Sequence, residues 1–197
     1  MSATSGPYGL LPIGDNTGNV RPLRMPNGIA NGYAANIFRG TPINIAAATG
    51  LMQAVTTASQ QIFGVFAGVS YTPAGGSPTE SPFWPSGTQV DTNFDFFAYY
   101  WPAWTGTARF AIQADGTVAQ AAMGGGLNLS NFTAGNTTTG LSACTAAFAG
   151  VAVGVQAQLA LFEFNTGINS AIGDAFTDLV VGIAYPQIVA GYQTSIG

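Results

Sequence analysis

The feature that most constrains the fold of this chain is a series of short apolar or alternating runs, each ended by glycine, proline or a polar turn. Alternation with a period of two is the pattern of a β-strand, and no helical segments alternate with these runs. We therefore predict an all-β fold, a compact β-barrel or β-sandwich of short antiparallel strands. The runs lie at residues 34–38, 42–47, 62–71, 94–104, 109–114, 117–121, 151–164 and 178–184.

Several segments carry more specific expectations. The run 62–71 is apolar at successive positions, so we expect a strand that is buried on both faces. The runs 109–114 and 117–121 flank Asp115-Gly116, a pair typical of a two-residue type I′ turn, and predict a β-hairpin. We expect a short helix near 52–60, and a loop or weak edge strands at 128–143. Residues 143–164 are long enough to cross a membrane, but they alternate from 151 onward and predict a strand.

The first 28 residues differ from the rest in composition. They contain four prolines, which makes regular structure improbable, and they also contain apolar side chains. A disordered terminus has no need of those side chains, whereas an extended arm that docks onto a neighbouring chain does. We therefore predict an extended N-terminal arm at 1–28 and a single β domain at 29–197. The apolar residues of the arm are Tyr8, Leu10, Leu11 and Ile13.

The scarcity of charge excludes several functions. Charged residues make up 6% of the chain, against about a quarter in an average soluble protein. Four arginines against eight carboxylates supply no basic stripe, so we expect no nucleic-acid binding. The chain has no histidine or lysine, which excludes Ser-His-Asp, Cys-His and Ser-Lys sites and predicts a protein that is not an enzyme. A surface this poor in charge predicts contact with other protein.

The remaining candidates for chemistry are carboxylates and one thiol. Asp91 and Asp95, and likewise Asp174 and Asp178, lie four residues apart, a spacing open to a metal site, a glycosidase pair or plain turn residues. Neither pair matches a calcium-loop signature, so we expect turn residues and neither a metal nor a cofactor. Cys144 is the single cysteine, and we expect a buried small side chain rather than a reactive thiol.

Aromatic residues crowd between positions 83 and 104. The tryptophans there lie beside proline or glycine, and such side chains anchor an interface, stack on sugars or complete a core. Phe83 and Trp84 stand between two prolines in SPFWP, which predicts a stiffened anchor for a sister subunit or for the body of the same domain. The expected interface residues are Tyr8, Leu10, Leu11, Ile13, Arg21, Arg24, Phe83, Trp84, Trp101 and Trp104.

An ordered set of motifs resembles a known family. The order is NGYAANIFRGTPI, IFGVFAGVSYT, SPFWPSGT, ARFAIQADGTVAQAAMG, NTTTGLSA, and lastly QLALFEFN with GDAFTDLVVGI. Over residues 32–183 the chain is similar to the capsid decoration or cement proteins of tailed bacteriophages. Each motif is structural rather than chemical, and the resemblance depends on their occurring together in this order.

The resemblance implies a structural virion protein on the outer surface of an icosahedral phage head. Its expected partners are the major capsid protein and further copies of itself, as a trimer in preference to a dimer, without nucleic acid or membrane. It would bridge neighbouring capsomers and stabilise the head against the pressure of packaged DNA. The alternative is a carbohydrate-binding module for host adhesion that stacks sugars on Trp84 or Trp104. A glycosidase that uses one of the aspartate pairs is the third hypothesis.

Overall fold

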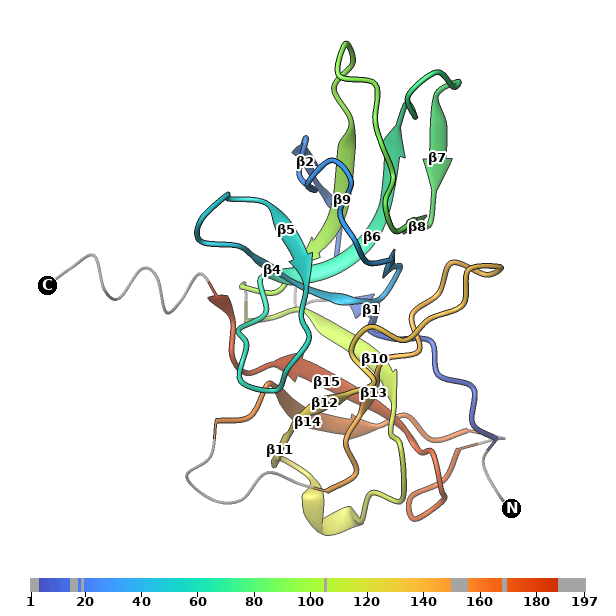
Figure 1. Cartoon of the computed structure of the whole chain (residues 1–197). Helices are drawn as coiled ribbons and strands as arrows, with labels where there is room; N and C mark the ends of the chain where they lie inside the picture. Colours follow the sequence, from blue (N-terminus) through green and yellow to red (C-terminus); the bar gives the residue numbers. More distant parts are fainter. Residues whose placement is uncertain are drawn as a thin grey trace, which may run out of the picture.

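A computed structural model of the chain describes residues 4–14, 18, 20–104, 106–149, 156–167 and 170–187. These residues form antiparallel β-sheets that pack against one another (Figure 1), which confirms the predicted all-β class. Neither of the two large sheets that they form closes on itself, so the sandwich and not the barrel describes the architecture. A 3-10 turn at Gln120–Ala122 interrupts the strands. Among the described residues no helix is long and apolar enough to span a bilayer.

The larger sheet has six strands and occupies the upper half of Figure 1. Its order is β2-β9-β6-β4-β5. Strand β4 pairs with the first residues of β6, and β7 pairs with the last residues of β6. Every pairing in it is antiparallel; short connections join β4 to β5 and β6 to β7, whereas β9 pairs with strands that lie far from it along the chain. The strands are β2 (Leu23–Pro26), β4 (Pro42–Ile45), β5 (Met52–Ala54), β6 (Gly64–Tyr71), β7 (Thr79–Ser81) and β9 (Phe97–Pro102).

The second sheet has five strands in the order β1-β10-β15-β14-β11 and lies below the first in Figure 1. Two further pairs, β12 with β13 and β3 with β8, extend the sandwich at its side. The strands are β1 (Leu11–Gly14), β10 (Arg109–Gln113), β11 (Gly126–Leu127), β14 (Leu159–Phe164) and β15 (Asp178–Ile183). The pairs are β3 (Ile37–Phe38), β8 (Phe83–Trp84), β12 (Leu129–Ser130) and β13 (Thr145–Ala146).

Two hydrophobic clusters hold the sheets together. The first joins them, because Val65 and Trp101 of the six-stranded sheet pack in it with Phe110 and Val181 of the five-stranded sheet. The second lies on the other face of the six-stranded sheet and includes Phe66. In strand β6, the side chain of Val65 packs in the first cluster and that of Phe66 in the second, and both side chains are fully buried. This confirms the prediction that the run 62–71 is buried on both faces.

The predicted hairpin at Asp115-Gly116 is wrong. Strand β10 is already paired on both sides, with β1 through Leu11 and with β15 through Val180, so it has no free edge for residues 117–121. Neither turn residue has the positive φ that a type I′ turn requires. Instead the Asp115 carboxylate accepts hydrogen bonds from the Ser130 hydroxyl and from the backbone N–H of Phe148, at 2.8 Å for the latter.

The predicted helix near 52–60 is also wrong. Its first residues form β5, where Ala54 pairs with Ile43 of β4. The remainder is a turn closed by the side chain of Gln60, whose amide oxygen accepts hydrogen bonds from the backbone N–H of Thr56 at 2.7 Å and of Thr57 at 3.1 Å. Pairing with β4 buries Ala54 and therefore outweighs the local helical pattern. In the predicted strand 151–164, the described part forms β14, and residues 151–155 lie outside the described ranges.

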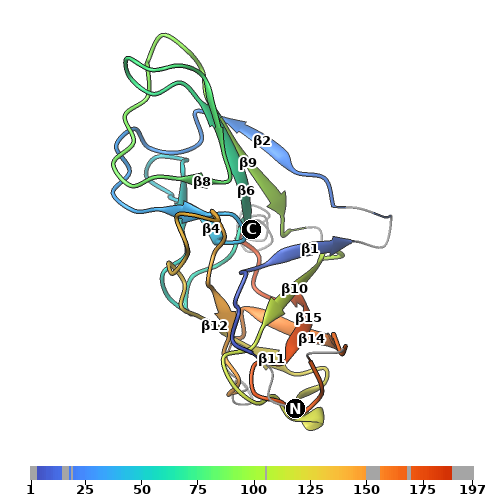
Figure 2. The ribbon, with the colours of Figure 1, turned by 90° about the vertical axis from the view of Figure 1, so that its right-hand side faces the viewer.

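The N-terminal segment belongs to both sheets of its own chain rather than to a separate arm. Strand β1 is the edge of the five-stranded sheet, and β2 is the edge of the six-stranded sheet (Figure 2). Leu10 is fully buried in the cluster that joins the sheets, and its backbone N–H donates to the carbonyl of Gly40 at 2.9 Å. The described part of residues 1–28 therefore contributes an edge strand to each of the two large sheets of its own chain.

Candidate functional site

The first aspartate of each pair, Asp91 or Asp174, stabilises a local turn of the backbone. Asp91 accepts hydrogen bonds from the backbone and side-chain nitrogens of Asn93 at 3.0 and 2.8 Å, and closes the turn before β9. Asp174 accepts from the backbone N–H of Ala171 at 3.1 Å in the turn before β15. Both are the turn residues that the sequence analysis expected. Within the described ranges no three histidine, cysteine or acidic side chains gather as metal ligands would.

The second member of each pair contacts a segment far away in sequence. Asp95 accepts from the side-chain amide of Asn27 at 2.8 Å, which joins the start of β9 to the end of β2. Asp178 accepts from the hydroxyl of Tyr8 at 3.1 Å, which ties the N-terminal segment to β15. Burial, reinforced by the negative charge of Asp178, raises the pKa of Tyr8 above its ordinary value. Both contacts join segments that are distant in sequence and so stabilise the fold. Neither contact pairs the aspartate with a second carboxylate, as a glycosidase site would require.

The single thiol is inert in this fold. Cys144 is buried, and burial raises the pKa of its thiol to about 12. At neutral pH the nucleophilic thiolate is therefore a negligible fraction. The thiol donates to the carbonyl of Ser130 at 3.3 Å, so it also fills a packing role between β12 and β13. The prediction of a buried small side chain is confirmed.

Trp84 and Phe83 anchor the body of their own domain. Trp84 is fully buried, with its ring 5.5 Å from Tyr71 and 5.3 Å from Phe96. Phe83 stacks on Phe38 of the adjacent strand β3, with ring centroids 5.5 Å apart. The proline-framed FW element thus forms β8, which pairs with β3, and its tryptophan lies in the second hydrophobic cluster. Trp84 is corrected from an interface residue to a core residue and offers no surface for a sugar.

The other two tryptophans are also engaged within the chain. Trp101 is 5% exposed and packs in the cluster between the two sheets. Trp104 is half-buried beside Phe63 and Tyr100, with ring centroids 4.9 and 5.9 Å away. Trp101 is therefore a core residue rather than an interface residue. Trp104 keeps part of its surface.

The predicted N-terminal contact residues divide into buried and exposed ones. Leu10 belongs to the core, and Tyr8 and Leu11 are half-buried against the five-stranded sheet. Ile13 is 51% exposed on the outer edge strand β1, and Arg21 is exposed before β2. Ile13 and Arg21 therefore keep the surface that an interface role requires, whereas Leu10 does not.

Three of the four arginines lie over aromatic rings of their own chain. The guanidinium carbon of Arg24 is 5.0 Å from the ring centroid of Phe97, and that of Arg109 is 3.8 Å from Phe162. The guanidinium carbon of Arg39 lies over the ring of Trp101, 5.4 Å from its centroid. Such contacts present flat, amphipathic Arg–aromatic surfaces instead of a concentrated positive patch. They suit protein contact better than a phosphate backbone.

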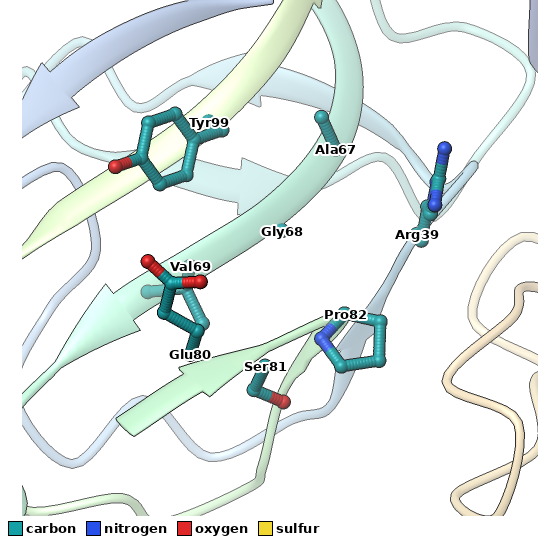
Figure 3. Close-up of a pocket in the computed structure, with 8 residues that line it drawn as sticks. All are labelled: Arg39, Ala67, Gly68, Val69, Glu80, Ser81, Pro82 and Tyr99. Carbon is teal, nitrogen blue, oxygen red and sulfur yellow. The ribbon is translucent and has the colours of Figure 1, made fainter. Parts of the chain in front are cut away.

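The face of the six-stranded sheet that carries Trp101 also contains an open hollow of about 410 Å³, here called the Tyr99 hollow (Figure 3). Figure 3 shows Tyr99 and Glu80 toward one end and Arg39 at the other, with β6 as the floor between them. Gly68 lies at a β-bulge in that floor, where it adopts a φ of +148° and adds no side chain. The lining residues are Arg39, Ala67, Gly68, Val69, Glu80, Ser81, Pro82 and Tyr99.

The chemistry of the Tyr99 hollow is that of recognition. Its one nucleophile candidate, the hydroxyl of Ser81, is occupied by the backbone of Phe83, donating to its carbonyl at 2.6 Å. The hollow brings together an arginine, a carboxylate and a phenol, which are common in protein interfaces and form no acid–base pair with a nucleophile. Sequence reasoning did not single out Glu80 or Tyr99. The alternation of 97-FAYYW-101 was the available signal, since it places Phe97, Tyr99 and Trp101 on one face.

Comparisons of the chain with protein-family models, with curated proteins and with solved structures found no match.

Proposed function

We propose that this protein is a capsid decoration protein that binds the outer surface of an icosahedral phage head and bridges neighbouring capsomers. The observation that carries the proposal is a surface with few charges that exposes large apolar side chains from both sheets, which favours contact with other protein. Ile13 of β1 and Leu23 of β2 are 51% and 42% exposed. The others are Phe94, Met123, Phe148, Phe162 and Ile172, at 41–60%. The resemblance of the ordered motifs to those of phage decoration proteins supports the same role.

The proposed mechanism is stabilisation by binding. Packaged DNA pushes shell subunits apart, and a protein that binds only the assembled arrangement stabilises that arrangement by mass action. Contacts with several capsomers at once add avidity, so each can be an ordinary interface of about 800 Å² per partner. Exposed apolar residues on both sheets would serve separate contacts. We propose a homotrimer at three-fold or local three-fold positions, with a dimer at two-folds as the alternative. The role needs no cofactor, metal or catalytic group.

The test uses purified heads that lack the protein. Added back, the chain should co-sediment with the heads in a fixed ratio and raise the temperature at which they release DNA. Leu23→Glu and Ile172→Glu place a charge in exposed apolar positions and should weaken binding, since a buried unpaired charge is costly at an interface. Gln89→Glu adds the same charge at an exposed polar site and serves as the control.

Two results would overturn the proposal. One is a head whose heat resistance is the same with and without bound protein. The other is an absence of co-sedimentation by the folded chain. Light scattering of the isolated protein separates trimer from dimer, and it leaves the decoration role itself unaffected.

A further inference from the structure

A second hollow lies at the opposite face of the six-stranded sheet, between the end of β2 and the turn that precedes β9. We call it the Phe94 hollow; its volume is about 320 Å³, within the range of about 300–1,000 Å³ typical of small-molecule sites. Its floor is apolar, formed by Ile29, Val90 and Phe96, all of which are buried. Its rim carries Asn27, Asn31, Thr92 and Asp95. A concave apolar floor with a few polar groups is the general form of a ligand site.

One aromatic ring stands out at this rim. Phe94 is 60% exposed, the most exposed of the large apolar side chains described. The backbone at Phe94 is held in a turn, because its N–H donates to the carbonyl of Asp91 at 3.3 Å and the Asp91 side chain closes that turn. Exposing a phenyl ring to water is unfavourable unless something covers it. A ligand with a flat apolar face would do so.

The polar groups at the rim are held in fixed orientation. The amide oxygen of Asn31 accepts from the backbone N–H of Val90 at 3.0 Å, and that of Asn27 accepts from Phe96 at 3.1 Å. Each amide NH₂ group is therefore directed away from the backbone it holds. That of Asn27 donates to Oδ1 of Asp95 at 2.8 Å. Among the described residues, the NH₂ group of Asn31 and Oδ2 of Asp95 have no hydrogen-bond partner, so a donor and an acceptor are free at one rim.

These features select a class of ligand. An anion such as phosphate is disfavoured, because the hollow has a carboxylate and no cationic side chain in its lining. A purely apolar ligand would cover Asp95 and Asn31 without satisfying them, which is costly. A neutral sugar has hydroxyl groups that both donate and accept, together with an apolar C–H face. We propose that the Phe94 hollow binds a neutral hexose, with the C–H face on Phe94 and hydroxyls on Asp95 and Asn31.

This site is distinct from the one that the loop tryptophans suggested, because Trp84 is buried and contributes only packing behind Phe96. It shares Phe94 with the exposed apolar residues proposed to contact the head, whereas Asn31 and Asp95 belong to the hollow alone. If the protein decorates a capsid, the virion would present these sugar-binding hollows. If the protein has another structural role, the same site would still be present.

The experiment measures binding of methyl glycosides of glucose, galactose, mannose and N-acetylglucosamine by ¹⁵N–¹H chemical-shift titration. At least one should bind with a dissociation constant in the millimolar range and shift the amide signals of residues 27–31 and 90–96. Such an affinity suits one stacking contact and a few hydrogen bonds. Phe94→Ala and Asp95→Asn should each weaken binding by about tenfold.

Phe148→Ala is the matched control, since Phe148 is a similarly exposed phenylalanine (55%) far from the hollow in the fold, beside Gly116. It should leave sugar binding unchanged. The spectra themselves report whether each variant is folded. Absence of binding by all four glycosides would overturn the proposal, and so would binding that survives both rim substitutions. Head co-sedimentation of the same variants is scored separately, so failure of one proposal is distinguishable from failure of the other.

Discussion

Replacing Leu10 with alanine tests whether the N-terminal segment is part of the core or a separable arm. Leu10 is fully buried between the two sheets. The segment fits closely there, because a Cβ built on Gly9 would lie 2.7 Å from the carbonyl oxygen of Gly40 and one on Gly40 would lie 2.9 Å from that of Tyr8. A segment packed at such close range against the rest of the chain is an integral part of the fold.

The expected magnitude follows from burial. The substitution removes three carbons of a buried side chain, about 2.4 kcal/mol at roughly 0.8 kcal/mol for each methylene equivalent. The cavity left in the core raises the loss of unfolding free energy to about 3–5 kcal/mol. Ile13→Ala is the matched control, because Ile13 is 51% exposed three residues along the same segment. A surface truncation of this kind costs about 0.5 kcal/mol or less.

The assay is urea unfolding followed by tryptophan fluorescence, to which buried Trp84 and Trp101 contribute. With a slope of about 2 kcal/mol per molar urea, Leu10→Ala should lower the midpoint by about 1.5–2.5 M, and Ile13→Ala should barely move it. Deletion of residues 1–28 should abolish the cooperative transition, since it removes an edge strand from each sheet. A midpoint for Leu10→Ala within about 0.3 M of the wild type would refute the integral role of this segment.

Three further outcomes are expected. The free energy of unfolding should decline as the pH rises above about 10, because the pKa of Tyr8 is higher in the folded than in the unfolded state. The stability that this difference contributes is complete below the unfolded-state pKa and is lost at higher pH. Tyr8→Phe should reduce the decline, as measured by urea titrations at several pH values. Iodoacetamide should leave Cys144 unmodified in the native protein at pH 8 and alkylate it in urea, as read by mass spectrometry; rapid native labelling would contradict its burial. Gly68→Ala should lower stability by about 1–3 kcal/mol in calorimetry, since Gly68 has a positive φ and its Cβ would lie 3.1 Å from the Ser81 carbonyl; an unchanged melting temperature would show that the bulge relaxes.

The two hollows could not be predicted from the sequence. The Tyr99 hollow unites Arg39, Glu80 and Tyr99, which come from three separate stretches of chain. The Phe94 hollow likewise joins residues 27–31 to 90–96, through the contact of Asn27 with Asp95. Spacing along the chain contains no signal for either grouping, because strand pairing between distant residues creates both. The turn role of Asp91, by contrast, follows from a neighbour two residues away and was predictable.

By itself the sequence determined the all-β class and the positions of the main strands, because alternation and turn residues act within a few positions of each other. It also determined that β6 is buried on both faces and Cys144 is buried. Only the tertiary structure decided which strands pair. Pairing leaves β10 no free edge, so Asp115-Gly116 forms no hairpin. The packing of distant strands also buries Trp84 against Tyr71 and Phe96. It also places Leu10 in the core, because the burial of an apolar residue in a proline-rich segment depends on distant strands that meet around it.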